Sequence, residues 1–275
     1  MNFKKKKPSL ADLADRNHLY ELSVQCAEAE VDFVNTTFSD LRGRKPRKIR
    51  EDFCGTANVC CEWVKRSKKN FAVGVDLDPK VLDWGKSHHL SKLNKEARQR
   101  VDLIEGDVLG IKTAKVDALL AMNFSYWVFK EREILLQYFK GAYQNLENDG
   151  ILFLDAFGGY DSFREIDEER EIEEDGQEFD YIWDQAKFNP ITNHLKCHIH
   201  FSFPDGSILR EAFTYDWRMY TLPEIKDILM DAGFSDVIIY WQGWDDDDED
   251  GDGDFYRADN ADADAGWICY IAAIK

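Results

Sequence analysis

Apolar positions in the first half of the chain alternate between two spacings. Short continuous apolar runs, such as Phe71 to Asp76 (FAVGVD), are typical of strands buried on both faces of a parallel sheet. Between these runs, apolar residues recur at three- and four-residue steps, which indicates amphipathic helices. Strand and helix alternate five times, which predicts a doubly wound, mostly parallel α/β sheet. The expected strands are 49–53, 71–76, 101–104, 116–122 and 151–155, with helices at 57–66, from 79, and at 131–146.

The pattern differs at both ends of this core. A helix is predicted over 19–41, where Ala27, Val31, Val34, Phe38 and Leu41 repeat at helical steps. After the fifth strand, three strand-like runs joined by turns predict an inserted antiparallel β layer, a lid or substrate layer. These runs are 181–188, 194–203 and a third that ends at residue 215. A capping box at 221–224 begins a helix that ends at residue 233, and strands at 237–241 and 267–274 follow.

We therefore expect a single domain over residues 1–275. Its predicted parts are an N-terminal helical cap at 1–47, a cofactor-binding half at 48–156, the inserted layer at 157–220, and C-terminal helix and strands at 221–275 that include an acidic loop at 245–264. At this length the chain can bury a full hydrophobic core.

Composition and charge narrow the function. The formal net charge of −18 argues against a nucleic-acid partner, because phosphate contacts need a basic surface. No apolar run is long enough to span a bilayer, and the lysine-rich start lacks the apolar core of a signal peptide. The six cysteines show no framework spacing, so a cytoplasmic protein with reduced thiols is expected.

The chemistry is expected where the predicted parallel strands end, because ligands of doubly wound sheets bind across the carboxyl ends of their strands. The first strand leads into Glu51-Asp52-Phe53-Cys54-Gly55-Thr56-Ala57, and the second ends at Asp76, twenty-one residues beyond Gly55. A carboxylate in the position of Asp76 can accept hydrogen bonds from both hydroxyls of a ribose.

The first loop distinguishes between nucleotide ligands. A dinucleotide fold would have glycine where Phe53 and Ala57 stand, and Glu51 would repel a pyrophosphate. An adenosyl ligand with a positive charge in place of phosphates needs only Gly55 for close approach, and it is attracted by a carboxylate at Glu51. The loop therefore favours a cationic adenosyl ligand over NAD.

The ordered motifs E-x-x-x-G-x-A, GVD at Asp76, GD at Asp107 and NFSY after the fourth strand resemble those of the class I S-adenosylmethionine-dependent methyltransferases that act on small molecules. The resemblance covers about residues 49–155. It implies a Rossmann-like, seven-stranded sheet whose last strand is antiparallel, with S-adenosyl-L-methionine as cofactor. The cofactor-binding residues that it implies are Tyr20, Glu51, Phe53, Gly55, Thr56, Asp76, Leu77, Asp107, Val108, Asn123, Phe124 and Ser125.

A methyltransferase of this type acts mainly by positioning and desolvation, since the methyl group is displaced in line from an activated sulfonium. The expected acceptor is a small molecule with a nitrogen or oxygen nucleophile. Residues expected to contact it are Tyr126, Trp127, Tyr160, Trp183, Arg218 and Tyr220, and the candidates for a general base are Tyr126, Tyr160 and His200. Core packing is the alternative for each aromatic side chain.

Two alternatives to a methyltransferase stay open from the sequence. One is an NAD-dependent oxidoreductase on a similar sheet, and the other is a non-catalytic protein that binds the cofactor or a partner. No metal site is expected. Cys197-His198-Ile199-His200 lacks a second ligand pair, and the EF-hand-like run 248–259 is preferred as a solvated acidic loop over a calcium site.

Overall fold

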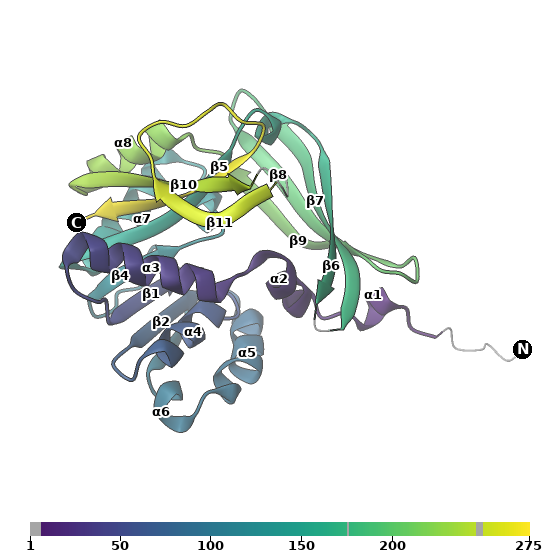
Figure 1. Ribbon diagram of the computed structural model, residues 1–275, viewed down its shortest axis with the longest axis horizontal. Coiled ribbons are helices and arrows are strands. Elements are labelled where there is room, and N and C mark those ends of the chain that lie inside the picture. The colour runs from purple at the N-terminus through teal and green to yellow at the C-terminus, as the bar shows by residue number, and fades with distance from the viewer. Residues whose placement is uncertain (1–6, 175, 246–249) are drawn as a thin grey trace, which may run out of the picture. The chain divides into compact units, whose positions relative to one another are not determined.

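The computed structural model describes residues 7–174, 176–245 and 250–275, and the chain divides into two compact units (Figure 1). The larger unit consists of residues 27–160 and 220–275, and the smaller unit consists of residues 1–26 and 161–219. Each unit contains its own β-sheet, and each is described separately below.

The larger unit is built on an eight-stranded sheet with the order β11-β10-β12-β5-β4-β1-β2-β3. Its strands are β1 (Lys48–Asp52), β2 (Phe71–Asp76), β3 (Val101–Glu105), β4 (Val116–Ala121), β5 (Leu146–Gly158), β10 (Asp236–Asp245), β11 (Asp250–Arg257) and β12 (Trp267–Ile274). Strands β1 to β5 are parallel to one another, whereas β12 is antiparallel to both β5 and β10. The doubly wound, mostly parallel sheet with an antiparallel strand near residues 267–274 is confirmed.

The prediction of seven strands is wrong by one, because β11 adds an eighth. Residues 250–257 pair antiparallel with β10 through their backbone, so the predicted acidic loop at 245–264 contains a strand. Of the EF-hand-like run, residues 248 and 249 lie outside the described residues. The part from Asp250 onward is extended backbone, not the tight loop that an EF-hand requires.

Helices cover both faces of the larger sheet. They are α3 (Ala27–Arg42), α4 (Asn58–Arg66), α5 (Pro79–His88), α6 (Lys95–Arg98), α7 (Arg132–Asn145) and α8 (Leu222–Ala232), with the short 3₁₀ helices η1 (Leu90–Lys92) and η2 (Ser125–Val128). Helices α3 and α4 share one apolar core with the sheet, and Figure 1 shows α3 crossing in front of the strands. Neighbouring residues of a strand point to opposite faces. Because Glu51 contacts α4 and Asp52 contacts α7, these two helices cover opposite faces.

The predicted helix ends in this unit are confirmed by their caps. Asp78 caps α5, with Pro79 at its first position. Thr221 and Glu224 form the predicted capping box of α8, and Gly233 ends that helix with a φ of 110°.

The smaller unit consists of α1 (Leu10–Leu13), α2 (Arg16–Val24), the 3₁₀ helix η3 (Asp161–Phe163) and a four-stranded antiparallel sheet. Its strands, in the order β6-β7-β8-β9, are β6 (Asp167–Glu174), β7 (Gln177–Asn189), β8 (His194–Ser202) and β9 (Ile208–Arg218). The inserted antiparallel layer is therefore confirmed, with one strand more than expected.

The predicted helix over residues 19–41 is wrong as one element. It is interrupted at Gln25, which has extended backbone, and it forms the separate helices α2 and α3. The two halves bury their apolar faces in different cores. Leu19 packs with Phe179 and Phe201 in the smaller unit, whereas Val31 belongs to the core of the larger unit.

Among the described residues, no helix has both the length and the apolar character needed to cross a bilayer.

Candidate functional site

Strands β1 to β5 are parallel, so their carboxyl ends lie along one edge of the larger sheet. Asp76 ends β2, Asp107 and Asn123 follow β3 and β4, and Glu51 and Asp155 lie within the last four residues of β1 and β5. This edge brings together the predicted cofactor-binding residues of the larger unit.

The turn between β1 and α4 has the backbone of a glycine-rich loop although it contains one glycine. Phe53, Gly55 and Ala57 all have a positive φ, of 58°, 52° and 58° respectively. A non-glycine residue in this region costs on the order of 1 kcal/mol, so the surrounding structure must hold Phe53 and Ala57 in place. Replacement of the two glycines therefore leaves the left-handed shape of the turn intact.

Packing on both sides holds this turn. The ring of Phe53 lies 5.9 Å from the rings of Phe129 and Tyr138, which anchors the first left-handed residue. On the other side, a Cβ atom added to Gly85 of α5 would meet the carbonyl oxygen of Thr56 at 2.1 Å, so only glycine permits this approach. At Gly55, by contrast, an added Cβ would meet no heavy atom within 4 Å, so the space above it is open.

Asp76 at the end of β2 connects two loops of the edge. Its Oδ2 accepts a hydrogen bond from the Gly55 amide at 2.8 Å, and its Oδ1 accepts one from the Asp78 amide at 2.9 Å. A carboxylate has about four acceptor positions, so two remain for hydroxyl groups of a ligand. Asp76 is half-buried, which leaves it accessible for such a contact.

The next positions along the edge present an apolar surface and a turn. Leu77 is 71% exposed, which is unusual for a large apolar residue beside a buried strand. After β3, Asp107 accepts a hydrogen bond from the Leu109 amide at 2.9 Å, and Val108 is half-buried. This combination of an exposed aliphatic side chain and an acidic turn suits the face and edge of a planar base.

Asp155 fixes the loop that follows β4. Asn123 and Phe124 both have left-handed backbone, and their amides donate to the two oxygens of Asp155 at 2.7 and 2.8 Å. Ser125 closes the loop by donating to the carbonyl oxygen of Met122 at 2.8 Å. Burial raises the pKa of Asp155 to about 7, although the two amides oppose this rise.

Three of the residues expected to contact the acceptor, Tyr126, Trp127 and Tyr220, are buried. Tyr126 and Trp127 are fully buried, and the Tyr126 hydroxyl donates to the carbonyl oxygen of Asp155 at 2.8 Å. The Tyr220 hydroxyl donates to the carbonyl oxygen of Phe129 at 2.6 Å. These contacts correspond to the packing alternative weighed for aromatic side chains. Tyr160 differs, because its side chain is 62% exposed immediately after β5.

Glu51 is a buried acid whose pKa is strongly perturbed. Its side chain accepts hydrogen bonds from the Cys60 amide at 3.2 Å and from the Cys60 thiol at 3.0 Å. Burial raises the pKa of Glu51 to about 7, and the negative charges of Asp76 and Asp52 add to this rise. Asp52 points to the other face of the sheet, where Arg50 pairs with it at 2.6 Å.

Sequence reasoning missed Glu30, which belongs to the same acidic group. It lies in α3, is 6% exposed, and has a pKa raised by burial and by the charges of Glu51 and Asp155. The sequence does indicate its burial: Glu30 follows Ala27 by three residues and precedes Val34 by four, so it lies on the apolar face of the helix. An acid on the buried face of an amphipathic helix is a candidate for function.

Four predicted site residues belong to the smaller unit. Tyr20 packs its ring 4.9 Å from Phe213 and hydrogen-bonds to Tyr215. Trp183 lies within an aromatic layer with Tyr215 and Trp217, at centroid distances of 5.9 and 6.2 Å. Arg218, the third of these residues, is half-buried at the end of β9.

His200, a candidate base, has both ring nitrogens engaged within the smaller unit. Its Nδ1 accepts a hydrogen bond from the Glu211 amide at 2.7 Å, which places the ring proton on Nε2. Nε2 then donates to the Asp184 carboxylate at 3.3 Å. In this arrangement the unprotonated nitrogen is already occupied, which favours a structural role.

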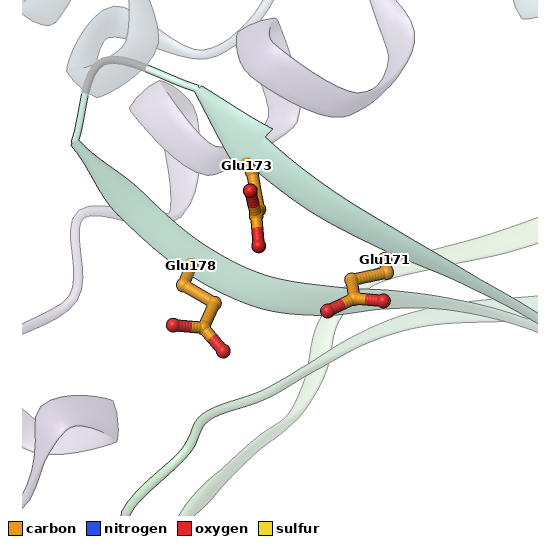
Figure 2. Close-up of side chains that lie close together, drawn as sticks. All are labelled: Glu171, Glu173 and Glu178. Atoms are coloured by element: carbon orange, nitrogen blue, oxygen red, sulfur yellow. The ribbon is translucent and has the colours of Figure 1, made fainter.

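The smaller unit also contains a group of exposed acids on the β6–β7 hairpin. Figure 2 shows Glu171, Glu173 and Glu178 side by side, with carboxylate oxygens within 4.8 Å of one another. Glu173 and Glu178 are directly opposite each other in the sheet. Because all three are exposed, water and salt screen their repulsion, and the group needs no bound ion.

Comparison with known proteins identifies the fold. No family model matches the chain, and no curated protein matches it in sequence. Solved structures do match it. An S-adenosylmethionine-dependent methyltransferase from Clostridium acetobutylicum is 16% identical with a TM-score of 0.67, and the match covers 94% of this chain and 96% of that chain.

Two further matches have the same extent. The amino pentose methyltransferase CalS10 from Micromonospora echinaspora, solved with S-adenosylmethionine bound, is 15% identical with a TM-score of 0.67 over 94% of this chain and 96% of that chain. DesVI from Streptomyces venezuelae is 14% identical with a TM-score of 0.68 over 98% of this chain and 99% of that chain. The chain therefore has the fold of S-adenosylmethionine-dependent methyltransferases, as its motifs predict.

Proposed function

We propose that the protein is an S-adenosylmethionine-dependent methyltransferase that acts on a small molecule. The observation that carries this proposal is the arrangement of Glu51, Gly55 and Asp76 at the carboxyl ends of β1 and β2. Asp76 holds the turn through the Gly55 amide, the space above Gly55 is open, and Glu51 is a buried acid. A ribose acid beside an anionic first loop suits a nucleoside that carries positive charge.

The edge offers a position for each part of the cofactor. Asp76 would accept hydrogen bonds from the ribose hydroxyls, and Leu77, Asp107 and Val108 would surround the adenine. The methionine end would lie over Gly55, with its ammonium group toward Glu51. Phe53 and Thr56 would shape the turn beneath it, and the loop of Asn123, Phe124 and Ser125 would border the methyl group.

The bound cofactor would supply an activated methyl group for in-line displacement. The contribution of the protein would then be to orient the acceptor and exclude water. Similar structures include an amino pentose methyltransferase and a sugar N-methyltransferase. We therefore favour a nitrogen acceptor on a small polar molecule, with an oxygen acceptor as the alternative. Tyr160 is the candidate acceptor contact that is exposed in the larger unit.

Binding of the cofactor is the first test, by isothermal titration with S-adenosylmethionine. Asp76→Ala should weaken binding about 100-fold, because the loss of two hydrogen bonds to a charged group costs roughly 3 kcal/mol. Asp83→Ala is the matched control, since Asp83 is an exposed acid of α5. Equal affinity of the wild type and Asp76→Ala would end the assignment, as would tighter binding of NAD than of S-adenosylmethionine.

Transfer is the second test and separates an enzyme from a binding protein. Cofactor labelled in its methyl group would be incubated with panels of small amines, amino sugars and phenols. Label should enter at least one amine, and the transfer should be lost in Asp76→Ala. Tight cofactor binding without transfer to any panel member would favour the non-catalytic alternative.

A further inference from the structure

A cavity of about 260 Å³ lies in the larger unit near the amino ends of β1 and β2. Its lining comes from α3, from the connection between α3 and β1, from α4, and from the connection between α4 and β2. Arg47 of the lining directly precedes β1, and Asn70 directly precedes β2. The proposed cofactor site lies at the opposite, carboxyl ends of the same two strands, so this cavity is a separate feature.

The lining is locally basic in a strongly acidic chain. The formal net charge of the whole chain is −18. The lining, by contrast, contains Lys45, Arg47 and Arg66 against one acid, Asp32. Arg66 is neutralised within the protein, because its Nε pairs with Glu62 at 2.8 Å and its Nη2 contacts Asp32 at 3.4 Å. The positive charges of Lys45 and Arg47 are the ones that remain.

Contacts within the protein hold the Arg47 side chain in place without neutralising it. Its Nη1 donates to Ser67 Oγ at 3.4 Å and to Asn70 Oδ1 at 3.3 Å, and both acceptors are uncharged. Asn70 is itself fixed, because it is 4% exposed and its Nδ2 donates to the carbonyl oxygen of Trp63 at 2.9 Å. The Trp63 indole donates to the carbonyl oxygen of Arg47 at 3.3 Å, which connects the backbone of Arg47 to α4. No described acid forms an ion pair with the Arg47 guanidinium.

Several donor groups of the lining have no acceptor among the described residues. They are Nε and Nη2 of Arg47, the ammonium group of Lys45 and the side-chain amide of Asn35. Lys45 and Asn35 accept hydrogen bonds from Arg44 and Ser39 through their backbone carbonyl oxygens, which leaves both side chains available. Nε and Nη2 form one edge of the guanidinium fork, and this edge can bind two oxygens of one anion at once. The cavity therefore offers a preorganised set of donors for an oxyanion.

Size and charge favour a phosphate group among the oxyanions. The cavity is somewhat smaller than the roughly 300 to 1,000 Å³ of pockets that enclose drug-sized ligands, so it suits a small ion or one group of a metabolite. A carboxylate carries a single negative charge, whereas a phosphate monoester carries about −1.5 to −2 near neutral pH. Two cations without acidic partners match the charge of the phosphate.

We propose that this cavity binds a phosphate group, either as the free ion or on a small monoester. Arg47 and Lys45 are its charged contacts, and Asn35 is a neutral donor from α3. This site goes beyond the proposed function and does not depend on it, because the two sites lie at opposite ends of β1 and β2. A phosphate bound here connects α3 to the segment that precedes β1, and it stabilises the folded state by mass action.

The test follows binding through the Trp63 indole, which lines the cavity and contacts Arg47. Inorganic phosphate, glycerol 3-phosphate and acetate would be added separately in NMR titrations of the isotopically labelled protein, with sodium chloride keeping the ionic strength constant. Phosphate should shift the signals of the Trp63 indole and the Asn70 amide. Saturation is expected at a Kd on the order of 1 mM, the affinity that a few charge-assisted hydrogen bonds supply. Acetate should bind about tenfold more weakly, because it carries less charge.

Lys45→Met should weaken phosphate binding about five- to tenfold, because it removes one charged contact. Lys45 is exposed and its ammonium has no acceptor among the described residues, so this variant should fold like the wild type. Lys68→Met is the matched control, since Lys68 is an exposed lysine of the α4–β2 connection that does not line the cavity. It removes the same charge and should bind phosphate within about twofold of the wild type. Arg47→Lys keeps the charge without the fork and should weaken binding about tenfold.

Shifts that grow linearly through the millimolar range without saturating would overturn the inference. Equal loss of affinity in Lys45→Met and Lys68→Met would also overturn it, because such a loss indicates general attraction of an anion. Acetate binding as tight as phosphate binding would contradict the assignment to a phosphate group. Tighter binding of glycerol 3-phosphate than of inorganic phosphate would assign the site to a monoester, and the reverse order would assign it to the free ion. The cofactor takes no part in these titrations, so the proposed function is tested separately.

Discussion

Acidic side chains near the two ends of β1 differ in their partners within the protein. At the amino end, Arg44 pairs with Asp117 at 2.8 Å and with Asp149 at 2.7 Å. The hydrogen bond from Arg44 lowers the pKa of Asp149. Nearby, Arg66 pairs with Glu62 at 2.8 Å and contacts Asp32 at 3.4 Å. Acids at this end have cationic partners within the protein.

At the carboxyl end the acids differ from one another: Asp52 pairs with Arg50 at 2.6 Å, whereas Glu51 and Asp155 accept hydrogen bonds from backbone amides and, for Glu51, from the Cys60 thiol. Glu30, Glu51 and Asp155 all have raised pKa values, with burial as the largest cause. Both ends belong to one unit and share one strand. Among these acids with raised pKa values, Glu51 and Asp155 are the ones that the proposed function places beside the cofactor.

The cavity proposed to bind phosphate lies near the amino end of β1. It has a volume of about 260 Å³ and is lined in part by Lys45, Arg47, Arg66 and Trp63. Arg66 is already engaged by acids, and Arg47 Nη1 donates to Ser67 and Asn70 at 3.4 and 3.3 Å. Two of the cationic side chains that line this cavity therefore have internal partners.

The largest expected effect comes from breaking a paired acid. Arg50 and Asp52 are both 1% exposed at the side chain, and Tyr138 donates to Asp52 at 3.0 Å. Arg50→Met should lower the free energy of unfolding by about 3 to 5 kcal/mol, because it leaves a buried charge without a partner. Urea unfolding would measure this change. The double variant Arg50→Met with Asp52→Asn should recover part of the loss, and no recovery would argue against the pair.

The next effect concerns the acid that shapes the loop after β4. Asp155→Asn should cost about 2 kcal/mol, since the amide has one acceptor oxygen where the carboxylate has two. Hydrogen exchange should accelerate most at the amides of Asn123 and Phe124. Unchanged exchange at these two amides would contradict the role assigned to Asp155.

The free protein should lose stability as the pH rises through neutrality. The pKa values of Glu51 and Asp155 are about 7, against ordinary values of 4.5 and 3.8. The folded state therefore binds protons more tightly than the unfolded state between these limits, and the stability present at low pH is lost as the pH approaches 7. Thermal unfolding should show a Tm several degrees lower at pH 8 than at pH 5.5. Glu51→Gln should flatten this dependence, and an unchanged slope would refute it.

The fold was readable from the sequence wherever strands are buried. Phe71–Asp76 and Trp267–Ile274 were predicted with their observed bounds because each is an apolar run between neighbouring strands. The two missed strands, β6 and β11, are both edge strands with acidic sequences, DEEREIEE and DGDGDFYR. Their hydrogen bonds come from the backbone, and edge strands favour charged residues, so no apolar pattern marks them.

The sequence predicts those site residues whose place depends on their position along a strand. Glu51, Gly55 and Asp76 lie at strand ends that the pattern located, and the structure places them together. Glu30 was missed because its proximity to Glu51 depends on how α3 packs, which spacing along the chain does not determine. Residue type alone does not decide the role of Tyr126 and Trp127, which are fully buried, since an aromatic side chain suits the core as well as a ligand site.

The smallest expected effect tests the orientation of Glu51. The Cys60 thiol donates to Glu51 at 3.0 Å, so Cys60→Ala should weaken S-adenosylmethionine binding about two- to threefold. Cys60→Ser keeps a donor at this position and should bind like the wild type. The comparison would be made by titration at pH 7.5, and equal loss in both variants would assign the effect to packing.

The contrast between the acids at the two ends of β1 is tested most directly by counting protons during cofactor binding. If the acids at the carboxyl end bind a cation, they are partly protonated in the free protein and ionise when the cation binds. Titration calorimetry at pH 6.5, in buffers that differ in ionisation enthalpy, should show net release of about one proton per S-adenosylmethionine bound. Glu51→Gln should release fewer protons. Net release of zero, or uptake of protons, would contradict the placement of the positive charge of the cofactor beside these acids.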